Sequence, residues 1–142
     1  MKHTTIVTVG TSILGNIARS FPDIASFVNS GDYESAARLC ADMDIKTMRK
    51  LSAELNSTIS MIDSGIIEPV RMYLVYSDTE DGKRVSELLK RVFKNPGQRY
   101  SFNDVEIVQV NDLNDGDYDN FRKNGLRNFV MEICGILRRY PA

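Results

Sequence analysis

The sequence predicts an α/β protein with a Rossmann-like, three-layer fold, in which helices flank a parallel sheet. Two observations support this prediction. Short runs rich in β-branched, aliphatic or aromatic residues, typical of strands buried on both faces, recur at residues 4–9, 72–76 and 105–110. Apolar residues at helical spacing occupy the segments between these runs. Alternating strands and helices favour a parallel sheet, and 142 residues fit a single domain spanning 1–142.

The segment between the first two strands is expected to form a helical insert, because its roughly 60 residues exceed what a parallel crossover requires. Asp32 is positioned to cap one helix of this insert, whose apolar face carries Ala36, Leu39, Cys40 and Met43. A further helix is predicted from Met48 to Ile62, and Gly65 is expected to end it. Its apolar residues, three or four positions apart, are Met48, Leu51, Leu55, Ile59 and Ile62.

Two later helices complete the pattern. One follows the second strand and is ended by Pro96 and Gly97; its apolar stripe consists of Val85, Leu88, Leu89, Val92 and Phe93. The last helix carries Phe121, Phe129, Val130, Ile133 and Leu137. The visible strands are fewer than the usual five or so, and the sequence ends where another strand is expected. We therefore expect an amino-terminal fragment whose carboxyl-terminal part is missing.

The balance of charge argues against two classes of partner. The chain has 18 basic and 19 acidic side chains, a net charge of −1, so no overall positive field would attract long nucleic acid or an anionic membrane. No apolar run approaches the roughly 18 residues of a membrane span, and no convincing cleavage site marks a signal peptide. These features predict a cytoplasmic protein.

Cysteine and histidine usage argues against metal centres and several catalytic classes. Cys40 and Cys134 lie on apolar stripes and in no CxxC pattern, which favours two reduced core thiols over a disulfide. The only histidine, His3, is interpreted as a bystander, so neither a His-Cys zinc site nor a Ser-His-Asp triad is expected. The acidic stretch from Asp104 to Asp119 fits no register of a calcium-binding loop, so we expect it to cap the last helix. We predict no metal and no cofactor.

The loop after the first strand, VGTSILGN at residues 9–16, is the first candidate ligand site. Ligands of parallel sheets bind beyond the carboxyl ends of the strands. Gly10 lets backbone N–H groups approach a ligand, Thr11 and Ser12 add hydroxyls, and a helix starting nearby would add its positive end. These features suit a phosphate. The loop matches neither GxGxxG nor a Walker loop, so a plain strand-to-helix turn remains the alternative.

The second candidate is the loop after the second strand, SDTEDGK at residues 77–83. Asp78 or Thr79 can cap the following helix, and this structural interpretation alone explains the loop. The functional alternative is that its acids and hydroxyls read the base and sugar edges of a ligand. The basic residues between Lys83 and Arg99 alternate with an apolar stripe, which predicts a solvated face; a rim that attracts anions is the alternative.

Four segments, in this order along the chain, resemble the CRISPR-associated Rossmann-fold (CARF) family, in the ring-nuclease and effector-sensor branch of type III CRISPR systems. They are IVTVGTSIL (6–14) with Asn16, LSAELNS (51–57), LVYSDTEDG (74–82) and FRKNGLRN (121–128). The resemblance implies a homodimer whose two-fold axis passes through a shared pocket for a cyclic oligoadenylate, most simply cyclic tetra-adenylate. Two-fold symmetry suits a ring with an even number of identical units.

The resemblance also implies roles for individual residues. Phosphate and ribose would lie against the first loop, at Gly10, Thr11, Ser12 and Ile13, with Asn16 close by. Ser77, Asp78 and Thr79 would line the adenine side, and Glu54 and Asn56 would support or touch the ligand. Members of the family usually carry a glycine-rich turn with a lysine after the last helix seen here; this sequence does not include it, and Lys83 is the nearest available cation.

Three functions remain open from the sequence. The first is a sensor domain that binds cyclic oligoadenylate and regulates antiviral defence; no effector ribonuclease motif accompanies it. The second is a metal-independent ring nuclease, in which a ribose 2′-hydroxyl attacks the neighbouring phosphate and Ser12, with nearby amides, stabilises the developing charge. The third is a Rossmann-like enzyme acting on a mononucleotide, with Ser12 as phosphate anchor.

Overall fold

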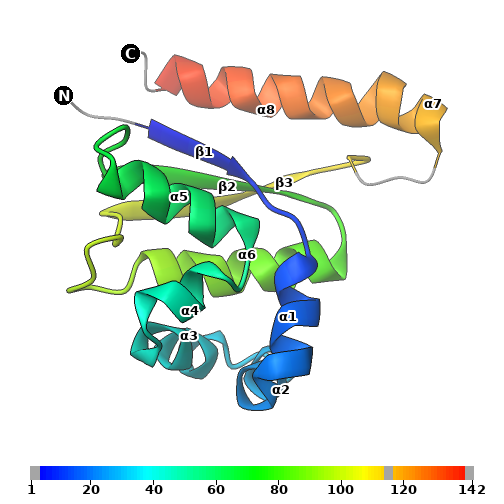
Figure 1. Ribbon diagram of the computed structural model, residues 1–142. Helices are drawn as coiled ribbons and strands as arrows, with labels where there is room; N and C mark the ends of the chain where they lie inside the picture. Colours follow the sequence, from blue (N-terminus) through cyan, green and yellow to red (C-terminus); the bar gives the residue numbers. More distant parts are fainter. Residues whose placement is uncertain (1–3, 114–116, 140–142) are drawn as a thin grey trace.

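The computed structural model describes residues 4–113 and 117–139, and His3 lies outside this range. Within it, three strands form one parallel sheet in the order β1-β2-β3 (Figure 1). They are β1 (Thr4–Thr8), β2 (Arg71–Ser77) and β3 (Asp104–Val110). In the register, Val7 lies opposite Leu74, and Leu74 lies opposite Ile107. The predicted parallel sheet is therefore confirmed, with each strand shifted by no more than about one residue at either end.

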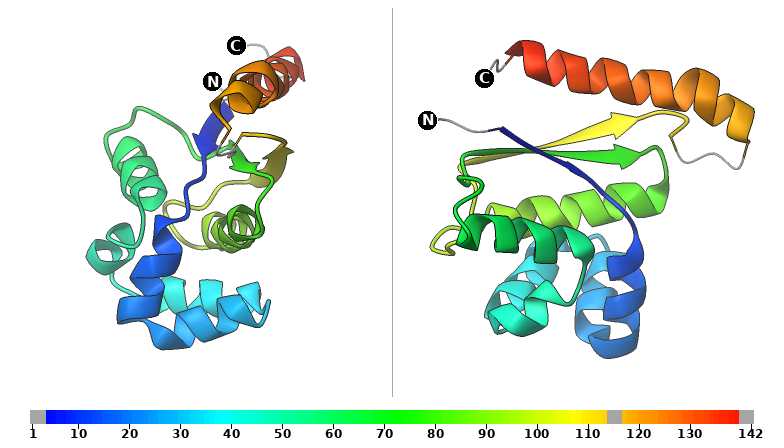
Figure 2. Two further views of the ribbon diagram at one scale, coloured as in Figure 1. Left: turned by 90° about the vertical axis from the view of Figure 1, so that its right-hand side faces the viewer. Right: turned by 45° about the horizontal axis from the view of Figure 1, so that its top comes forward.

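The helices fall into an insert, a crossover and a carboxyl-terminal group. The insert between β1 and β2 comprises α1 (Ser12–Ser20), α2 (Pro22–Asn29), α3 (Tyr33–Asp42), α4 (Ile45–Arg49) and α5 (Ala53–Asp63). The crossover from β2 to β3 contains α6 (Glu80–Phe93). After β3 come α7 (Tyr118–Asn120), a π-helical turn η1 (Phe121–Gly125) and α8 (Leu126–Arg139). Figure 2 shows α8 over one face of the sheet and α6, with α5, on the other, which confirms the three layers.

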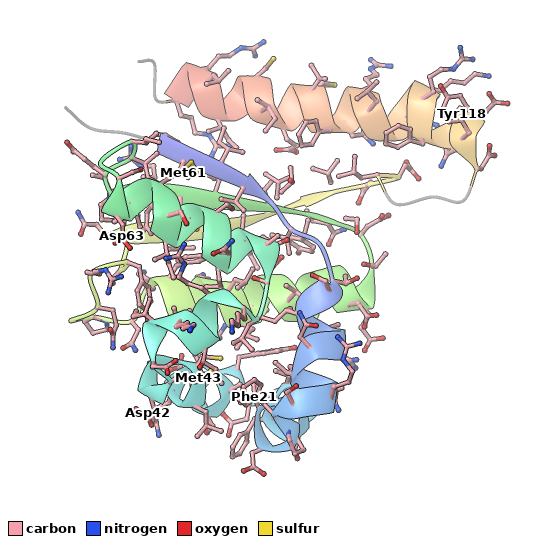
Figure 3. All side chains as sticks on the ribbon, viewed as in Figure 1. Phe21, Asp42, Met43, Met61, Asp63 and Tyr118 are labelled. Carbon is pink, nitrogen blue, oxygen red and sulfur yellow. The ribbon has the colours of Figure 1, made fainter. Side chains whose placement is uncertain are left out.

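The core lies between the sheet and the α5–α6 layer. Met72 and Leu74 of β2 are fully buried there with Leu55 of α5 and Leu89 of α6. The intervening Tyr73 is also buried, so β2 is covered on both faces, as its unbroken apolar run predicts. At the amino edge of the sheet, the Arg99 guanidinium makes a paired contact of 2.9 and 3.0 Å with the Asp63 carboxylate. Figure 3 places Asp63 at the opposite end of the molecule from Tyr118.

The helix predicted from Met48 to Ile62 is two helices, which corrects that expectation. Ser52 has extended backbone angles, φ −157° and ψ 159°, and its hydroxyl accepts a hydrogen bond from the N–H of Leu55, so it caps α5. The apolar spacing continues across the break because Met48 and Leu51 are buried on the same side as Leu55. Periodicity therefore did not reveal the interruption. The expected end was right: Gly65, two residues beyond α5, has φ +78°.

The predicted cap at Asp32 is present, and one residue of the acidic stretch also caps a helix. The Asp32 side chain accepts a hydrogen bond from the N–H of Ser35 and begins α3. Bonds from the hydroxyl and backbone N–H of Ser35 hold the pKa of the Asp32 carboxyl below its usual value. In the acidic stretch after β3, Asp117 accepts hydrogen bonds from the amides of Asp119 and Asn120 and caps α7; residues 114–116 lie outside the described range. The described residues contain no helix that is long and apolar enough to cross a membrane.

Cys134 does not belong to the core, contrary to the prediction. Cys40 is buried in α3, whereas Cys134 is exposed on α8. Helix α8 covers the sheet with Ile136, which is buried, and with Phe129 and Ile133, which are partly buried. The adjoining apolar stripe is exposed and contains Leu126, Val130, Cys134 and Leu137. The apolar residues of α8 therefore occupy a wider part of the helix circumference than the three-stranded sheet covers.

The two thiols are expected to react at very different rates. Burial raises the pKa of the Cys40 thiol to about 11, so at pH 7–8 it remains protonated and inaccessible, and the thiolate is the reactive form. We expect a disulfide reagent to label one thiol per native chain, at Cys134, and the second only after denaturation. Peptide mapping after alkylation checks the assignment, and rapid labelling of Cys40 in the native protein would contradict it.

Candidate ligand-binding site at the carboxyl edge of the sheet

The two candidate loops meet beyond the carboxyl ends of β1 and β2. A hollow of about 330 Å³ separates them, lined by Thr11 on one side and by Thr79, Glu80 and Asp81 on the other. Both loops lead from a strand into a helix, and α1 and α6 begin side by side at this edge (Figure 1). Parallel strands that each feed a helix bring such loops together.

The β1–α1 loop presents its backbone to this edge. The N–H of Val9 still bonds to the carbonyl of Val75, and from Gly10 to Ser12 the chain is exposed. Thr11 precedes α1 without a side-chain capping bond, and the first N–H groups of a helix have no partner within it. The side chain of Ile13 is 1% exposed and belongs to the core, so only its backbone would face a ligand.

The side chain of Glu54, which the resemblance placed near the ligand, binds the backbone of this loop, a contact that sequence reasoning did not predict. The N–H of Gly10 donates a 2.8 Å hydrogen bond to Glu54 Oε1 across 44 positions of sequence. The second carboxylate oxygen, Oε2, is buried and has no hydrogen-bond partner among the described residues. A carboxylate bound by a backbone amide stands where a phosphate oxygen would stand. Its unpartnered oxygen makes the arrangement costly, because an unsatisfied buried acceptor loses about 1–3 kcal/mol.

Asn16 and Asn56 are engaged elsewhere. The Asn16 side chain donates to the carbonyl of Leu51 at 2.7 Å and accepts from Arg19 at 2.7 Å, so it connects α1 to the break between α4 and α5. Asn56 is exposed and accepts a bond from Arg49; it is two residues from Glu54, which places it on the far side of α5. Both asparagine side chains therefore make hydrogen bonds within the protein, and neither lines the hollow.

The β2–α6 loop is arranged by Thr79 rather than Asp78. Thr79 Oγ1 accepts a 3.0 Å hydrogen bond from the N–H of Gly82 and lies 3.3 Å from Ser77 Oγ. Gly82 packs so closely that an added Cβ would be 2.9 Å from the carbonyl oxygen of Ser77. Asp78 and Lys83 are exposed. Of the two capping candidates, the structure selects threonine, which partly commits its hydroxyl to the helix.

Replacement of Thr79 by alanine is expected to destabilise the fold by about 1 kcal/mol, since α6 loses its capping acceptor. Asp78→Ala, one position earlier, removes a side chain that does not cap α6 and should change the free energy of unfolding by less than about 0.5 kcal/mol. Urea denaturation of both variants checks this. Equal losses in the two variants would show that charge, not capping, controls the start of α6.

The charges around the hollow differ between its two sides. Glu80 and Asp81 line the α6 side, and Arg84 lies 2.8 Å from Glu80 and 3.8 Å from Asp81. No basic side chain lines the hollow among the described residues. Carboxylates accept hydrogen bonds, so the α6 side suits hydroxyl or amino donors, whereas the α1 side offers amide donors and a positive helix end. Among the described residues, no group of three or more His, Cys, Asp or Glu side chains is arranged to hold a metal ion.

A comparison with protein families decides where this chain belongs. Residues 49–142, more than half of the chain, match the family model described as CRISPR-associated protein (Cas_APE2256). The chain is a member of the Cas_APE2256 family. The match covers Glu54 and the β2–α6 loop, while the β1–α1 loop precedes it. None of the curated proteins compared with this Cas_APE2256 chain matches it.

Proposed function

We propose that this Cas_APE2256 protein binds a cyclic oligoadenylate, most simply cyclic tetra-adenylate, at the carboxyl edge of its sheet and so acts as a sensor in type III CRISPR defence. The observation that carries the proposal is the meeting of the β1–α1 and β2–α6 loops at one hollow, lined by Thr11 and by Thr79 to Asp81. Membership of a CRISPR-associated family supports a role in that defence.

The chemistry of the two loops suits different parts of such a ligand. A phosphate would lie at Gly10 to Ser12, where amides and the positive end of α1 favour negative charge. The adenine amino group and ribose hydroxyls would face Glu80 and Asp81, which are acceptors. A phosphate at Gly10 would have to displace the Glu54 carboxylate from the same N–H.

A homodimer is the second part of this proposal. One hollow of about 330 Å³ is small for a ring of four nucleotides. In a dimer with a two-fold axis, the hollows of the two copies could face each other and bind one ring between them. Helix α8 carries exposed apolar side chains that a second copy would cover, including Val130 at 51% and Leu137 at 55% exposure. Sedimentation velocity with and without cyclic tetra-adenylate tests this: a monomer under both conditions contradicts the shared pocket.

Calorimetry with a matched pair of variants tests ligand binding. Cyclic tetra-adenylate is expected to bind more tightly than cyclic hexa-adenylate, linear tetra-adenylate, AMP or ATP. Ser12→Ala removes a hydroxyl at the start of α1 and should weaken binding about tenfold. Ser20→Ala, at the other end of the same helix, should leave the affinity unchanged. Tighter binding of AMP or ATP would favour a mononucleotide enzyme, and no binding of any cyclic oligoadenylate would refute the proposal.

Ring cleavage is a second candidate, favoured by the exposed position of Ser12 in the first turn of α1. In this reaction the ribose 2′-hydroxyl gives up its proton and its oxygen forms a bond to the adjacent phosphorus, while the bond from phosphorus to the 5′-oxygen breaks. The 5′-oxygen takes up a proton, so the products are a 2′,3′-cyclic phosphate and a 5′-hydroxyl. Ser12 and the nearby amides would stabilise the charge that develops on the phosphate. Incubation with cyclic tetra-adenylate without added metal, followed by chromatography, separates the two functions. If the ligand is recovered uncleaved, the protein binds it without cutting the ring.

A further inference from the structure

A second polar hollow lies between α3 and α6, away from the candidate ligand site. It has a volume of about 370 Å³ and lies beside the last turn of α6, with Lys90, Arg91 and Lys94 on that side and Arg38 of α3 on the other. The candidate ligand site adjoins the opposite end of α6, a helix of 14 residues and therefore about 20 Å long. The two hollows are separate features.

The basic side chains around this hollow differ in whether they form ion pairs with carboxylates. Arg91 is fixed: its guanidinium lies 3.1 Å from Glu34 and 2.6 Å from Glu87 and stacks 5.4 Å from the centre of the Tyr33 ring. Lys90, Lys94 and Arg38 make no ion pair within residues 4–113 and 117–139. Glu34, which contacts Arg91, also lines the hollow. Three cations thus border one hollow without a carboxylate bound to them.

This arrangement costs free energy in the empty protein. Lys90 lies in the last turn of α6 and Lys94 is the C-cap residue four positions later, a spacing at which like charges repel. The negative end of α6 offsets part of that repulsion. The Asp32 carboxylate, whose pKa is lowered by hydrogen bonds from Ser35 and also by Arg38, offsets part of the charge of Arg38 on α3. In a chain whose net charge is −1, such a local excess of positive charge favours an anion held between the two helices.

We propose that this hollow binds the phosphate monoester of a ligand about the size of a mononucleotide. A phosphate dianion has enough acceptor oxygens for Lys90, Lys94 and Arg38 at once. Ala37 and Pro96 line the same hollow and give the rest of the ligand an apolar wall, and Asn95 adds an amide. The volume lies within the range of small-molecule pockets, about 300–1,000 Å³.

The test combines binding with a map of where binding occurs. Inorganic phosphate, AMP and adenosine are titrated at low ionic strength into the full chain, labelled with nitrogen-15. We expect AMP to bind saturably and to shift the amide resonances of residues 37–38 and 90–95, phosphate to shift the same amides more weakly, and adenosine to leave them unmoved. Lys90→Gln combined with Lys94→Gln should weaken AMP binding at least tenfold, whereas Lys123→Gln, on η1, should not change it.

Any of three outcomes in the titrations with AMP, phosphate and adenosine would overturn the proposal. They are adenosine binding as tightly as AMP, no saturable shifts at residues 37–38 and 90–95, and AMP shifts confined to residues 10–13 and 77–82. A further titration compares an oligoribonucleotide that lacks a terminal phosphate with its 5′-phosphorylated form. Equal binding of that RNA and of its 5′-phosphorylated form would show that the hollow contacts nucleic-acid backbone and not a monoester. The maps on the unaltered protein decide the matter even if the double variant fails to fold.

Discussion

Glu54→Gln is expected to raise the affinity for cyclic tetra-adenylate about tenfold. In the structure the Glu54 carboxylate holds the N–H of Gly10, the group proposed to bind phosphate. Two unit charges about 4 Å apart repel by roughly 4 kcal/mol near a protein surface, and the movement of Glu54 into water would relieve much of that. Glutamine keeps an acceptor for Gly10 while removing the charge, so the phosphate displaces a neutral group. Calorimetry at fixed salt measures the change.

Glu106→Gln is the matched control, because Glu106 is exposed on β3 and lies outside the hollow. The same change of net charge there should leave the affinity within about twofold, since exposed charges more than about 10 Å away are largely screened at 0.1 M salt. A weaker affinity of the Glu54→Gln protein would mean that the carboxylate holds the ligand instead of competing with it. An unchanged affinity in both variants would separate Glu54 from the site altogether.

Gly125→Ala is expected to destabilise the protein by about 3 kcal/mol. A Cβ at this position would stand 2.1 Å from the carbonyl oxygen of Asp112 and 2.7 Å from its carbonyl carbon. Both atoms are backbone, so no side-chain rotation relieves the clash. Asp112 has φ +62°, which leaves little freedom to move the turn after β3. Such overpacking costs about 1–3 kcal/mol or more. Urea denaturation followed by circular dichroism measures it.

Gly135→Ala provides the comparison within the same helical segment. Apart from its chain neighbours and the adjacent backbone of α8, no heavy atom of the described residues lies within 4 Å of the Cβ that alanine would add there, and glycine within α8 lowers helix stability. We therefore expect Gly135→Ala to stabilise the protein by about 0.5–1 kcal/mol. A similar loss in both variants would attribute the effect to helix α8 itself and not to its contact with the turn after β3.

The strands, and the helix ends marked by a capping side chain or a glycine, were predictable because their signals are local. The continuous apolar run of β2, the capping position of Asp32 and the positive φ at Gly65 each depend on neighbouring residues. The break at Ser52 was not predictable from periodicity, because the apolar spacing is the same in one helix or two. The exposure of Cys134 depends on how much of α8 the sheet covers, a tertiary property that an apolar stripe does not specify.

The candidate site was predictable in outline and not in detail. Both loops could be placed at one edge, since parallel strands end there together. The contact between Gly10 and Glu54, and that between Asn16 and Leu51, join residues 44 and 35 positions apart. No spacing rule connects residues so distant in sequence. The family resemblance placed Glu54 near the ligand, but a carboxylate that binds the Gly10 amide is the opposite of what a phosphate site suggests.

The unequal lengths of chain between paired strands have a consequence for the order of folding. Thr4 of β1 pairs with Arg71, whereas Arg71 pairs with Asp104, so the β1–β2 pairing closes about twice as much chain. Closing the larger loop costs only about 0.6 kcal/mol more in entropy, but pairing distant in sequence slows association. In refolding pulse-labelled by hydrogen exchange, we expect protection of β2 and β3 before β1. The glycine-containing turn that follows β1 would then be among the last parts of the molecule to acquire its native shape.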